Sequence, residues 1–551
     1  MFKIARTMNS MEFNPELPED VKVVIIATLT FMLMGDNLQK RDISDNNNQN
    51  NQNMAADYPE FKTKKAVLNV EINGENQKFD KVTFKIAGKT ARSYSKPPFN
   101  LKIRGGQDLF GRSHFKLRPD CADPSLLRTK LVSDIHNRLG VTSLSSNYIT
   151  LYINEEYMGL YTLNDAFKSS WIEQVYGDKD TTSLYKCDFL FDFDPSSAAG
   201  CMNENEDVTD QTELIQFFES VKNAKSASDL EDIFEIDQFL TEMVIEYLTG
   251  SWDHLQNMIA GHNFYLYKQP NGKWIYLSYD FDLDFGIPLM NDSDKGSFKD
   301  YVKPLHIFDI LVFNDPTRFE NIMKNVITKA FNPDILYPHI DELKSLIKPF
   351  IELDKTPDTN GNYPGNLNTK GIAPFTYEDW DASTEFSTIE GVFFGTIYGL
   401  KNWVLMKYRD NCKIYNLECN PTYMDENYPY PTDNDTNTDT NTPSMTSNVT
   451  SPASTSINNK CWSELIGYPC CDSSVTTVFV QDDYGDWGYD FNKNEWCGIT
   501  SYEEKEEEEE CWSEPLGYSC CKTCVVYETD TDGSWGYENH QWCGIPSICQ
   551  K

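Results

Sequence analysis

The chain has 551 residues and a formal net charge of −37, with 85 Asp and Glu against 48 Lys and Arg. This length is enough for a large core and several domains. The excess of acid argues against a nucleic-acid binder, because attraction to phosphates needs a basic face. The sequence also lacks a run of the roughly 20 apolar residues that a membrane span requires. We therefore expect a multidomain protein with no nucleic-acid partner and no stable membrane span.

The longest apolar run, residues 23–34, has the length of the hydrophobic part of a secretory leader. The acidic residues before it count against a leader, and a buried strand or helix is the alternative. We favour the leader because ten of the 15 cysteines lie after residue 460, a density typical of oxidising compartments. Residues 1–57, which include an asparagine-rich spacer at 46–53, are thus predicted to be the leader and spacer of a secreted, extracellular protein.

Residues 58–422 have the patterning of one large domain. Alternating runs predict strands at residues 66–72, 81–86 and 99–104, and hairpins at 148–163 and 263–279. Asp123 as N-cap and Pro124 at the first helical position predict that a helix starts here. Its buried stripe would comprise Leu127, Leu131, Ile135 and Leu139. Further helices are expected at residues 228–250, 304–331, 334–353 and 387–407. A strand-rich half followed by a helix-rich half indicates the α+β class.

Three aspartates, Asp280, Asp282 and Asp284, stand at every second position after the second predicted hairpin. On a strand end their side chains would all face one way. Their mutual repulsion would then call for a cation, and hard oxygen ligands suit Mg²⁺, Mn²⁺ or Ca²⁺. A solvated acidic loop is the alternative, and the aromatic and aliphatic residues around the aspartates count against it.

Five motifs of the large domain occur in order: KPPFNLKIR at residues 96–104, ADPSLLRTKL at 122–131, NEEYMGLYTL at 154–163, HNFYLY at 262–267 and YDFDLDFG at 279–286. In these motifs the chain resembles the spore-coat CotH family of atypical protein kinases, over residues 58–407. The resemblance implies an atypical protein-kinase-like domain that transfers phosphate from ATP to protein Ser or Thr, using Mg²⁺ or Mn²⁺.

The resemblance also implies which residues carry out the reaction. Asp253 would be the catalytic aspartate that orients the accepting hydroxyl. Asp280 would be the first metal-binding carboxylate, with Asp282 close behind it. Asn257 or Asn263 would complete the coordination of the metal ion.

The ATP phosphates would be reached by a lysine on an early strand. Lys102 is the first candidate, and Lys96 and Arg104 are the alternatives. Two positions depart from the family pattern. The segment that usually resembles RGNSS reads AGKT at residues 87–90, and Asp165 stands where a glutamate is usual. Both changes bear on the affinity for the nucleotide.

The C-terminal part contains two copies of one segment, residues 461–499 and 511–551. A linker rich in Thr, Asn, Ser and Pro (residues 423–460) precedes the first copy, and a glutamate-rich linker (500–510) separates the two. Four cysteines in the first copy permit two disulfides, and two more in the second permit a third, with the pairing left open. Zinc binding is the alternative, for which the adjacent Cys470 and Cys471 are poorly spaced.

Both copies resemble the dockerin modules of anaerobic-fungal cellulosomes, which are similar to the small CBM10 carbohydrate-binding family. The resemblance implies binding to a scaffold protein or glycan of an extracellular complex, through exposed aromatic side chains and a nearby carboxylate. The matching residues are Asp482, Trp487 and Tyr489 in the first copy, and Asp530, Trp535 and Tyr537 in the second. Trp487 and Trp535 stand beside glycines in predicted turns, where we expect exposure, and filling of a tiny core is the alternative.

The sequence therefore predicts a secreted, cellulosome-associated kinase that is anchored by two dockerins. A catalytically inactive structural or adhesin component of the same assembly is the alternative. A glycoside hydrolase is a third alternative, but the sequence shows no glycosidase pattern.

Overall fold

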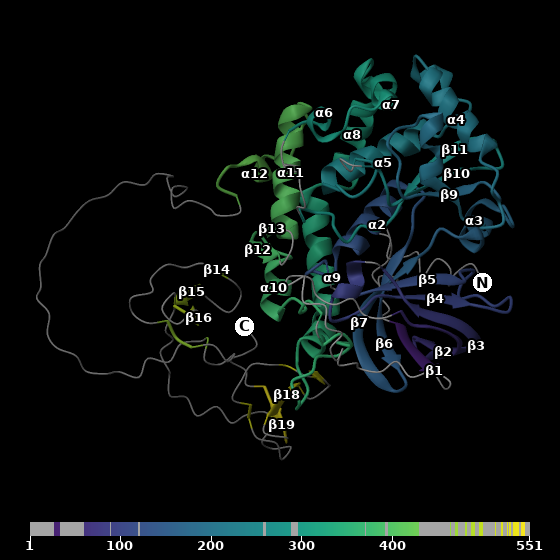
Figure 1. Ribbon diagram of the computed structural model, residues 1–551. Coiled ribbons are helices and arrows are strands. Elements are labelled where there is room, and N and C mark those ends of the chain that lie inside the picture. Colours follow the sequence, from purple (N-terminus) through teal and green to yellow (C-terminus); the bar gives the residue numbers. More distant parts are fainter. Residues whose placement is uncertain are drawn as a thin grey trace, which may run out of the picture. The chain divides into compact units, whose positions relative to one another are not determined.

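The computed structural model describes residues 27–33, residues 60–428 except 89, 120–121, 257–259, 288–295, 370 and 392–394, and short stretches between 463 and 545. Internal contacts divide the chain into two units, Met1–Thr436 and Asn437–Lys551. In the first unit the early strands form one part and most helices the other (Figure 1). The strand-rich beginning, the helical continuation and the small β modules confirm the predicted α+β class.

Seven strands of the first unit close into a barrel in the order β1-β2-β3-β4-β5-β7-β6. Their bounds are Ala27–Leu33 (β1), Lys62–Ile72 (β2), Glu75–Ile86 (β3), Phe99–Ile103 (β4), His114–Arg118 (β5), Ser146–Ile153 (β6) and Glu156–Asp165 (β7). Alternate side chains point inward and form an apolar core that includes Phe31, Phe84 and Phe99, each 0% exposed. The outward face of the same strands is therefore left for polar side chains.

The apolar run at residues 23–34 is a barrel strand in its described part, so the secretory-leader interpretation is wrong for residues 27–33. Strand β1 pairs antiparallel with β2 and parallel with β6. Leu29 and Phe31 are buried inside the barrel, which explains why the run is apolar. The large domain consequently includes residues before position 58, where the sequence placed its start.

The helix predicted to begin at Asp123 begins later, as α2 (Arg128–Leu139). Leu126 adopts a left-handed φ of 58°, which interrupts a right-handed helix. The carboxylate of Asp123 still accepts the backbone N–H groups of Ser125 and Arg128. It closes the turn that leads into α2 instead of capping the helix directly.

The hairpin predictions at residues 148–163 and 263–279 are confirmed. The first is β6–β7, whose turn residues Asn154 and Glu155 have φ of 51° and 69°, as a type I′ turn requires. The second consists of β10 (Phe264–Lys268) and β11 (Trp274–Ser278), which join β8 (Leu184–Cys187) and β9 (Cys201–Asn203) in one sheet of order β11-β10-β8-β9.

Helices are the main regular elements of the remaining large domain. The longer ones are α3 (Ser169–Tyr176), α4 (Thr212–Asn223), α5 (Ile236–Thr249), α8 (Thr317–Lys329), α9 (Pro333–Asp354) and α11 (Leu400–Ile414). The shorter ones are α6 (Phe298–Tyr301), α7 (His306–Phe308), α10 (Tyr377–Ala382) and α12 (Pro421–Met424), with single turns at Thr90–Ser93, Pro195–Gly200, Ala227–Asp229 and Asp309–Phe313. Among the described residues, no helix has the length and apolar character to cross a membrane.

Two predicted boundaries need correction. Residues 387–407 begin not as a helix but as a hairpin of β12 (Thr388–Gly391) and β13 (Gly395–Tyr398), because the helix α11 starts only at Leu400. The linker also starts later than residue 423. Arg409 donates hydrogen bonds to the carbonyls of Tyr423 and Tyr428, which holds this segment against the domain.

The second unit contains two equivalent three-stranded sheets. They are β14 (Val480–Gln481), β15 (Asp486–Asp490) and β16 (Glu495–Gly498), and β17 (Glu528–Thr529), β18 (Ser534–Glu538) and β19 (Gln541–Gly544). Trp487 pairs with Gly498 in one sheet as Trp535 pairs with Gly544 in the other. The disulfides Cys471–Cys497 and Cys521–Cys543 also correspond. Both observations bear out the internal repeat, and the disulfides exclude these four cysteines as zinc ligands.

Candidate functional site

The outward face of the barrel carries a row of basic side chains on β4 and β5. Phe115 and Leu117 point into the core, so His114, Lys116 and Arg118 lie on the opposite face. Lys102 of β4 is on that face too, directly opposite His114 in the strand register. Burial, together with the charges of Lys102 and Lys168, lowers the pKa of His114 to about 4.

The helical part brings Asp280 to this basic row. Nε of Arg118 lies 3.8 Å from Oδ1 of Asp280. Nζ of Lys116 lies 4.0 Å from the ring centroid of Tyr279, the preceding residue. Asp280 itself has a φ of 78°, a strained value for a residue with a side chain. Such strain is typical of functional positions, and here it marks the residue that the sequence placed first at the metal.

The charges at this meeting point shift one another. Burial would raise the pKa of Asp280, but Arg118 and Lys116 outweigh it and hold that pKa below its usual value. Burial and then the charge of Asp280 raise the pKa of Asp282 to about 7. Burial lowers the pKa of Lys116 to about 7, against the opposing effect of Asp280. A compact group of opposite charges whose pKa values are shifted in both directions is typical of a functional site.

Asp253 is held by two side chains of the segment that follows it. Nδ2 of Asn263 donates to Oδ2 of Asp253 at 2.9 Å, and also to its backbone carbonyl at 2.9 Å. Nε2 of His262 contacts Oδ1 of the same carboxylate, and this hydrogen bond raises the pKa of His262. The carboxylate is therefore fixed in orientation, as a residue that receives a proton must be.

The three aspartates do not all face one way, because β11 ends at Ser278 and residues 282–286 form turns. Asp284 is 2% exposed and accepts a hydrogen bond from Ser251 at 2.7 Å. Burial raises its pKa to about 8. Asp280 and Asp282 thus remain as the pair that can hold a cation, and Asp284 has a structural role.

Arg128 of the ADPSLLRTKL motif is a buried side chain that contacts several distant segments. Its guanidinium is 0% exposed and forms an ion pair with Asp123 at 2.6 Å. It also donates to the carbonyl of Asp284 at 2.8 Å and to that of Tyr398 at 2.9 Å. One buried side chain therefore joins the start of α2 to the turn that carries the aspartates.

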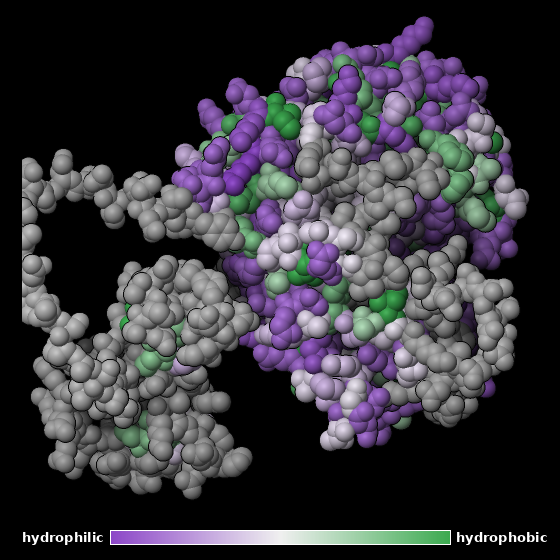
Figure 2. Space-filling view, turned by 60° about the vertical axis from the view of Figure 1, so that its left-hand side comes forward, coloured by the Kyte–Doolittle hydropathy of each residue, from purple (hydrophilic) through white to green (hydrophobic). Residues whose placement is uncertain are grey.

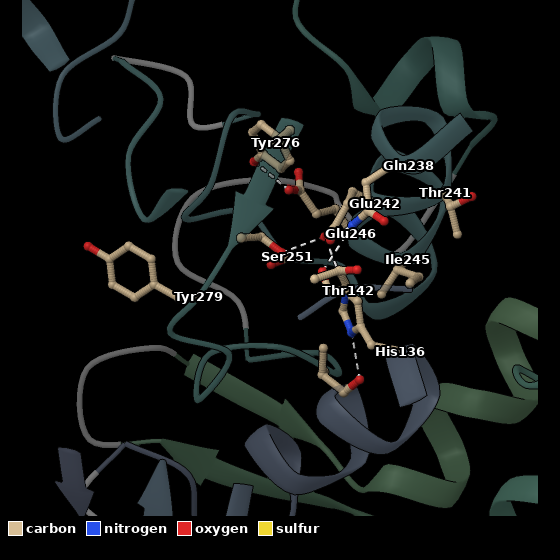
Figure 3. Close-up of polar contacts among 12 residues, drawn as sticks. His136, Thr142, Gln238, Thr241, Glu242, Ile245, Glu246, Ser251, Tyr276 and Tyr279 are labelled. Carbon is tan, nitrogen blue, oxygen red and sulfur yellow. Dashed lines mark hydrogen bonds and ion pairs between the residues drawn. The ribbon is translucent and has the colours of Figure 1, made fainter. Parts of the chain in front are cut away.

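Helix α2 is joined to α5 by a second buried polar group, shown in Figure 3. His136 lies 3.1 Å from Glu242 of α5, which also accepts hydrogen bonds from Ser278 and Gln238. Burial opposes charging of His136, but Glu242 outweighs it and raises the pKa of His136. This contact ties α2 to the strand end just before Asp280.

The three predicted nucleotide-binding side chains lie in different places. Lys102 is exposed on the basic face, as expected for a side chain that reaches a ligand. The prediction for Lys96 is wrong, because its side chain is 4% exposed and its ammonium pairs with Asp354 of α9 at 2.5 Å. Arg104 contacts the carbonyl of Lys64 on β2, so its guanidinium is bound at the far end of β4. Lys96 is therefore structural, because its buried charge is paired, whereas the role of Arg104 stays a prediction.

Two further predictions concern residues near the site. Asn257 lies outside the described residues. Asp165, the unusual acid at the end of β7, pairs with Arg112 at 3.2 Å, and burial raises its pKa. In the AGKT segment Gly88 has a φ of 76° and its Cβ position would touch Ala91, so this position suits glycine.

Sequence reasoning missed Lys116, Arg118 and His262. The alternation His114-Lys116-Arg118 between apolar residues was a usable signal, since it puts three basic groups on one face of a strand. His262 directly precedes Asn263, but nothing in the sequence indicates that its ring contacts Asp253. That contact depends on the loop between them.

The residues fit a divalent cation bound together with phosphate. Among the described residues no three His, Cys, Asp or Glu side chains are grouped as ligands of one metal ion. Mg²⁺, however, commonly uses one or two carboxylates and takes its other ligands from phosphates and water. Nη1 of Arg118 is buried and has no hydrogen-bond partner among the described residues, as expected of a donor that awaits an anion.

The predicted binding residues of the C-terminal modules are only partly described. Asp482 and Asp530 lie outside the described residues, as do the side chains of Trp487, Tyr489 and Tyr537. Trp487 and Trp535 lie on strands β15 and β18, not in turns. Trp535 is 9% exposed, counter to the expected exposure, whereas Trp542 on β19 is 41% exposed.

Fold and site together define a barrel-and-helix domain followed by disulfide-crosslinked repeats. The family described as CotH kinase protein matches residues 84–386, more than half of the chain, and the chain belongs to this family. The family described as cellulose or protein binding domain matches residues 460–499 and 510–545, in agreement with the two dockerin-like copies.

Individual relatives match either the large domain or the C-terminal modules. Spore coat protein homolog 1 of Rhizopus delemar is 28% identical over 331 residues, which are 55% of this chain and 52% of that protein. Feruloyl esterase B of Piromyces equi is 48% identical over 56 residues, 10% of this chain and 9% of that protein. The solved double dockerin from Piromyces equi Cel45A is 41% identical and covers 16% of this chain and 90% of its own, with a TM-score of 0.08. The chain thus spans about half the length of its relative from Rhizopus.

Proposed function

We propose that the large domain transfers the γ-phosphoryl group of ATP to a Ser or Thr hydroxyl of a protein. The C-terminal modules would attach it to a scaffold protein or glycan of an extracellular, cellulosome-type assembly. The observation that carries the catalytic part is the contact between Arg118 and Asp280, 3.8 Å apart. It puts a basic strand face and a carboxylate pair on the two sides of one site, as phosphoryl transfer requires.

The chain's own residues would bind and orient the triphosphate. Arg118, through its unpartnered Nη1, and Lys116 would donate to phosphate oxygens, with Lys102 farther along the same face. Asp280 and Asp282 would hold Mg²⁺ or Mn²⁺, which when bound neutralises the charge of the phosphates. Binding of a polyanion would also favour the charged form of Lys116.

Asp253 would act on the acceptor. Its carboxylate, fixed by Asn263 and His262, accepts the proton of the Ser or Thr hydroxyl as that oxygen attacks the γ-phosphorus. The bond from the γ-phosphorus to the bridging oxygen of the β-phosphate breaks, and ADP leaves with the electron pair. Fixing the carboxylate beforehand lowers the entropic cost of this step.

The attachment rests on the C-terminal repeats. Their family is described as binding cellulose or protein, and a segment of 56 residues recurs in a fungal esterase of otherwise different sequence. A module that is shared by unrelated enzymes serves their common location and not their separate reactions. Two copies on one chain would bind more tightly than one through effective concentration.

The test is phosphate transfer by the full chain from radiolabelled ATP to casein, with Mg²⁺ or Mn²⁺. Asp280→Asn should reduce the rate at least about a hundredfold, because the charge that holds the cation is lost. The control is Asp232→Asn, which removes one exposed acid and should leave the rate unchanged. Circular dichroism of each variant checks that the fold is intact.

Transfer by Asp280→Asn at the wild-type rate would refute the proposed site. Absence of transfer by the wild-type chain, with both metals and with chelator controls, would refute the kinase function. The inactive structural or adhesin role would then be the remaining proposal for the domain.

A further inference from the structure

Two phenylalanines near the candidate site have exposed side chains. Phe189 and Phe191 are 52% and 54% exposed, and their rings form an edge-to-face pair with centroids 5.0 Å apart. The face of the first unit in Figure 2 is mostly hydrophilic, with hydrophobic side chains in small patches. Adjacent exposed aromatic rings are costly in water and typically mark a contact surface. We call Phe189 and Phe191 the aromatic pair.

The backbone under the aromatic pair is anchored on one side to the core. Leu190, between the two rings, is 0% exposed, and Phe193 is 2% exposed. The N–H of Leu190 donates to the carbonyl of Gly261 at 2.9 Å, and the N–H of Gly261 donates back at 2.7 Å. Because Leu190 points inward, its two neighbours must point outward.

The segment is fixed on its other side by covalent and hydrogen bonds. Cys187 is joined to Cys201 by a disulfide. The N–H groups of Asp188 and Phe189 both donate to the carbonyl of Gly200, at 3.1 and 3.2 Å. A side chain at Gly200 would collide with the backbone of Phe189. The aromatic pair is therefore held rigidly, which reduces the entropy lost when a ligand binds.

The aromatic pair is connected to Asp253, the proposed catalytic residue, through two intervening residues. Gly261, which pairs with Leu190, precedes His262, and His262 contacts the carboxylate of Asp253. The charge of Asp188, next to Phe189, contributes to raising the pKa of His262. The contacts through Gly261 and His262 therefore link the aromatic pair to the segment that orients Asp253, the residue proposed to act on the accepting hydroxyl.

We infer that the aromatic pair is a docking surface for the acceptor polypeptide, which would place an aliphatic or aromatic side chain against the two rings. The inference rests on the proposed kinase function and names the class of its substrate: a Ser- or Thr-containing segment with an apolar residue near the hydroxyl. Asp188, next to the first ring, pairs with Lys186 at 2.6 Å, so the inferred recognition depends on the two rings and not on charge.

The test uses synthetic peptides that contain one serine in an Ala/Gln background, with a single leucine placed at each neighbouring position in turn. For the wild-type chain, one range of leucine positions should lower KM by about tenfold, the expected return for burying one apolar side chain. The variant F189S/F191S should lose this preference and keep its kcat on the leucine-free peptide. The control I215S/I414S removes two side chains that are 38% and 42% exposed and should keep the preference.

Direct binding of the same fluorescent peptides, measured by anisotropy, separates this inference from the kinase function. Binding that requires leucine and the aromatic pair, without phosphate transfer, would support the docking surface and refute the kinase function. Transfer with no leucine preference, or a preference retained in F189S/F191S, would refute the docking surface alone. If the wild-type chain neither binds nor phosphorylates any of the peptides, the docking surface is refuted together with the kinase function.

Discussion

The large domain and the C-terminal modules maintain their structures by different means. In the large domain, apolar side chains fill a closed barrel and a separate helical core, and dozens of them are fully buried. In the second module the described core consists of Cys521, Cys543 and Ile545. A segment of about 40 residues cannot bury enough apolar surface to offset its chain entropy. The disulfide therefore takes the place of the core.

Disulfides of the large domain show the other side of this comparison. Cys187–Cys201 and Cys412–Cys419 close segments with sequence separations of only 14 and 7 residues, within a domain that already has a large core. The gain from a crosslink grows slowly with the length of the loop that it closes. These bonds should shape the chain locally, as at the aromatic pair, without deciding whether the domain folds.

The largest expected effect follows directly. Reduction with a phosphine should unfold both C-terminal modules and leave the large domain folded. Each module loses crosslinks worth about 2–5 kcal/mol, comparable to its whole stability, whereas the large domain keeps its core. Limited proteolysis with mass spectrometry should show cleavage after residue 460, while the helical circular dichroism signal, which comes from α helices described only in the first unit, stays unchanged.

Modules that resist the protease after reduction would show that they have a sufficient apolar core. Loss of the helical signal under the same conditions would show that Cys187–Cys201 or Cys412–Cys419 supports the whole domain. Either result would remove the contrast between the two regions.

A second effect, destabilisation without unfolding, concerns the buried polar groups of the large domain. Arg128→Met should destabilise it by about 3–5 kcal/mol, because Asp123 would stay buried without its counter-charge. The carbonyls of Asp284 and Tyr398 would also lose their donor. Urea unfolding followed by the helical signal measures the change. Lys324→Met, an exposed cation on α8, is the control and should change the stability by less than about 0.5 kcal/mol.

An unfolding midpoint of Arg128→Met equal to that of the wild-type chain would show that the apolar packing of α2 is sufficient by itself. The C-terminal modules of the variant and of the wild-type chain should be cleaved at the same rate, since Arg128 belongs to the first unit only.

Local chemistry determined which elements the sequence could predict. The turn at Asn154 and Glu155 was predictable because Asn154 readily adopts a positive φ and alternating strands flank the two residues. Residues 23–34 were not, because an apolar run of that length suits a leader as well as a barrel strand. The difference lies in pairing with residues far along the chain, β6 above all, and no local pattern reports such pairing.

The candidate site divides in the same way. Asp253 and Asp280 could be singled out because each lies in a motif of consecutive residues, and their roles stay predictions. Lys96 was misassigned because its partner, Asp354, is 258 residues away, and only that ion pair identifies it as structural. Arg118 was missed because its importance depends on Asp280, which the fold brings from another element.

The smallest expected effect separates the basic side chains on the two sides of the barrel wall. Lys116→Met and Lys102→Met should each weaken binding of a non-hydrolysable ATP analogue, Lys116 by about tenfold and Lys102 by less, because Lys116 lies nearer to Asp280. Lys96→Met should leave the affinity unchanged and lower the stability, since Asp354 would be left buried and unpaired. Calorimetric titration gives the affinities, and urea unfolding gives the stabilities. Equal affinities for the Lys96 and Lys102 variants would show that the outward face of β4 does not contact the nucleotide. The phosphates would then be bound by β5 alone.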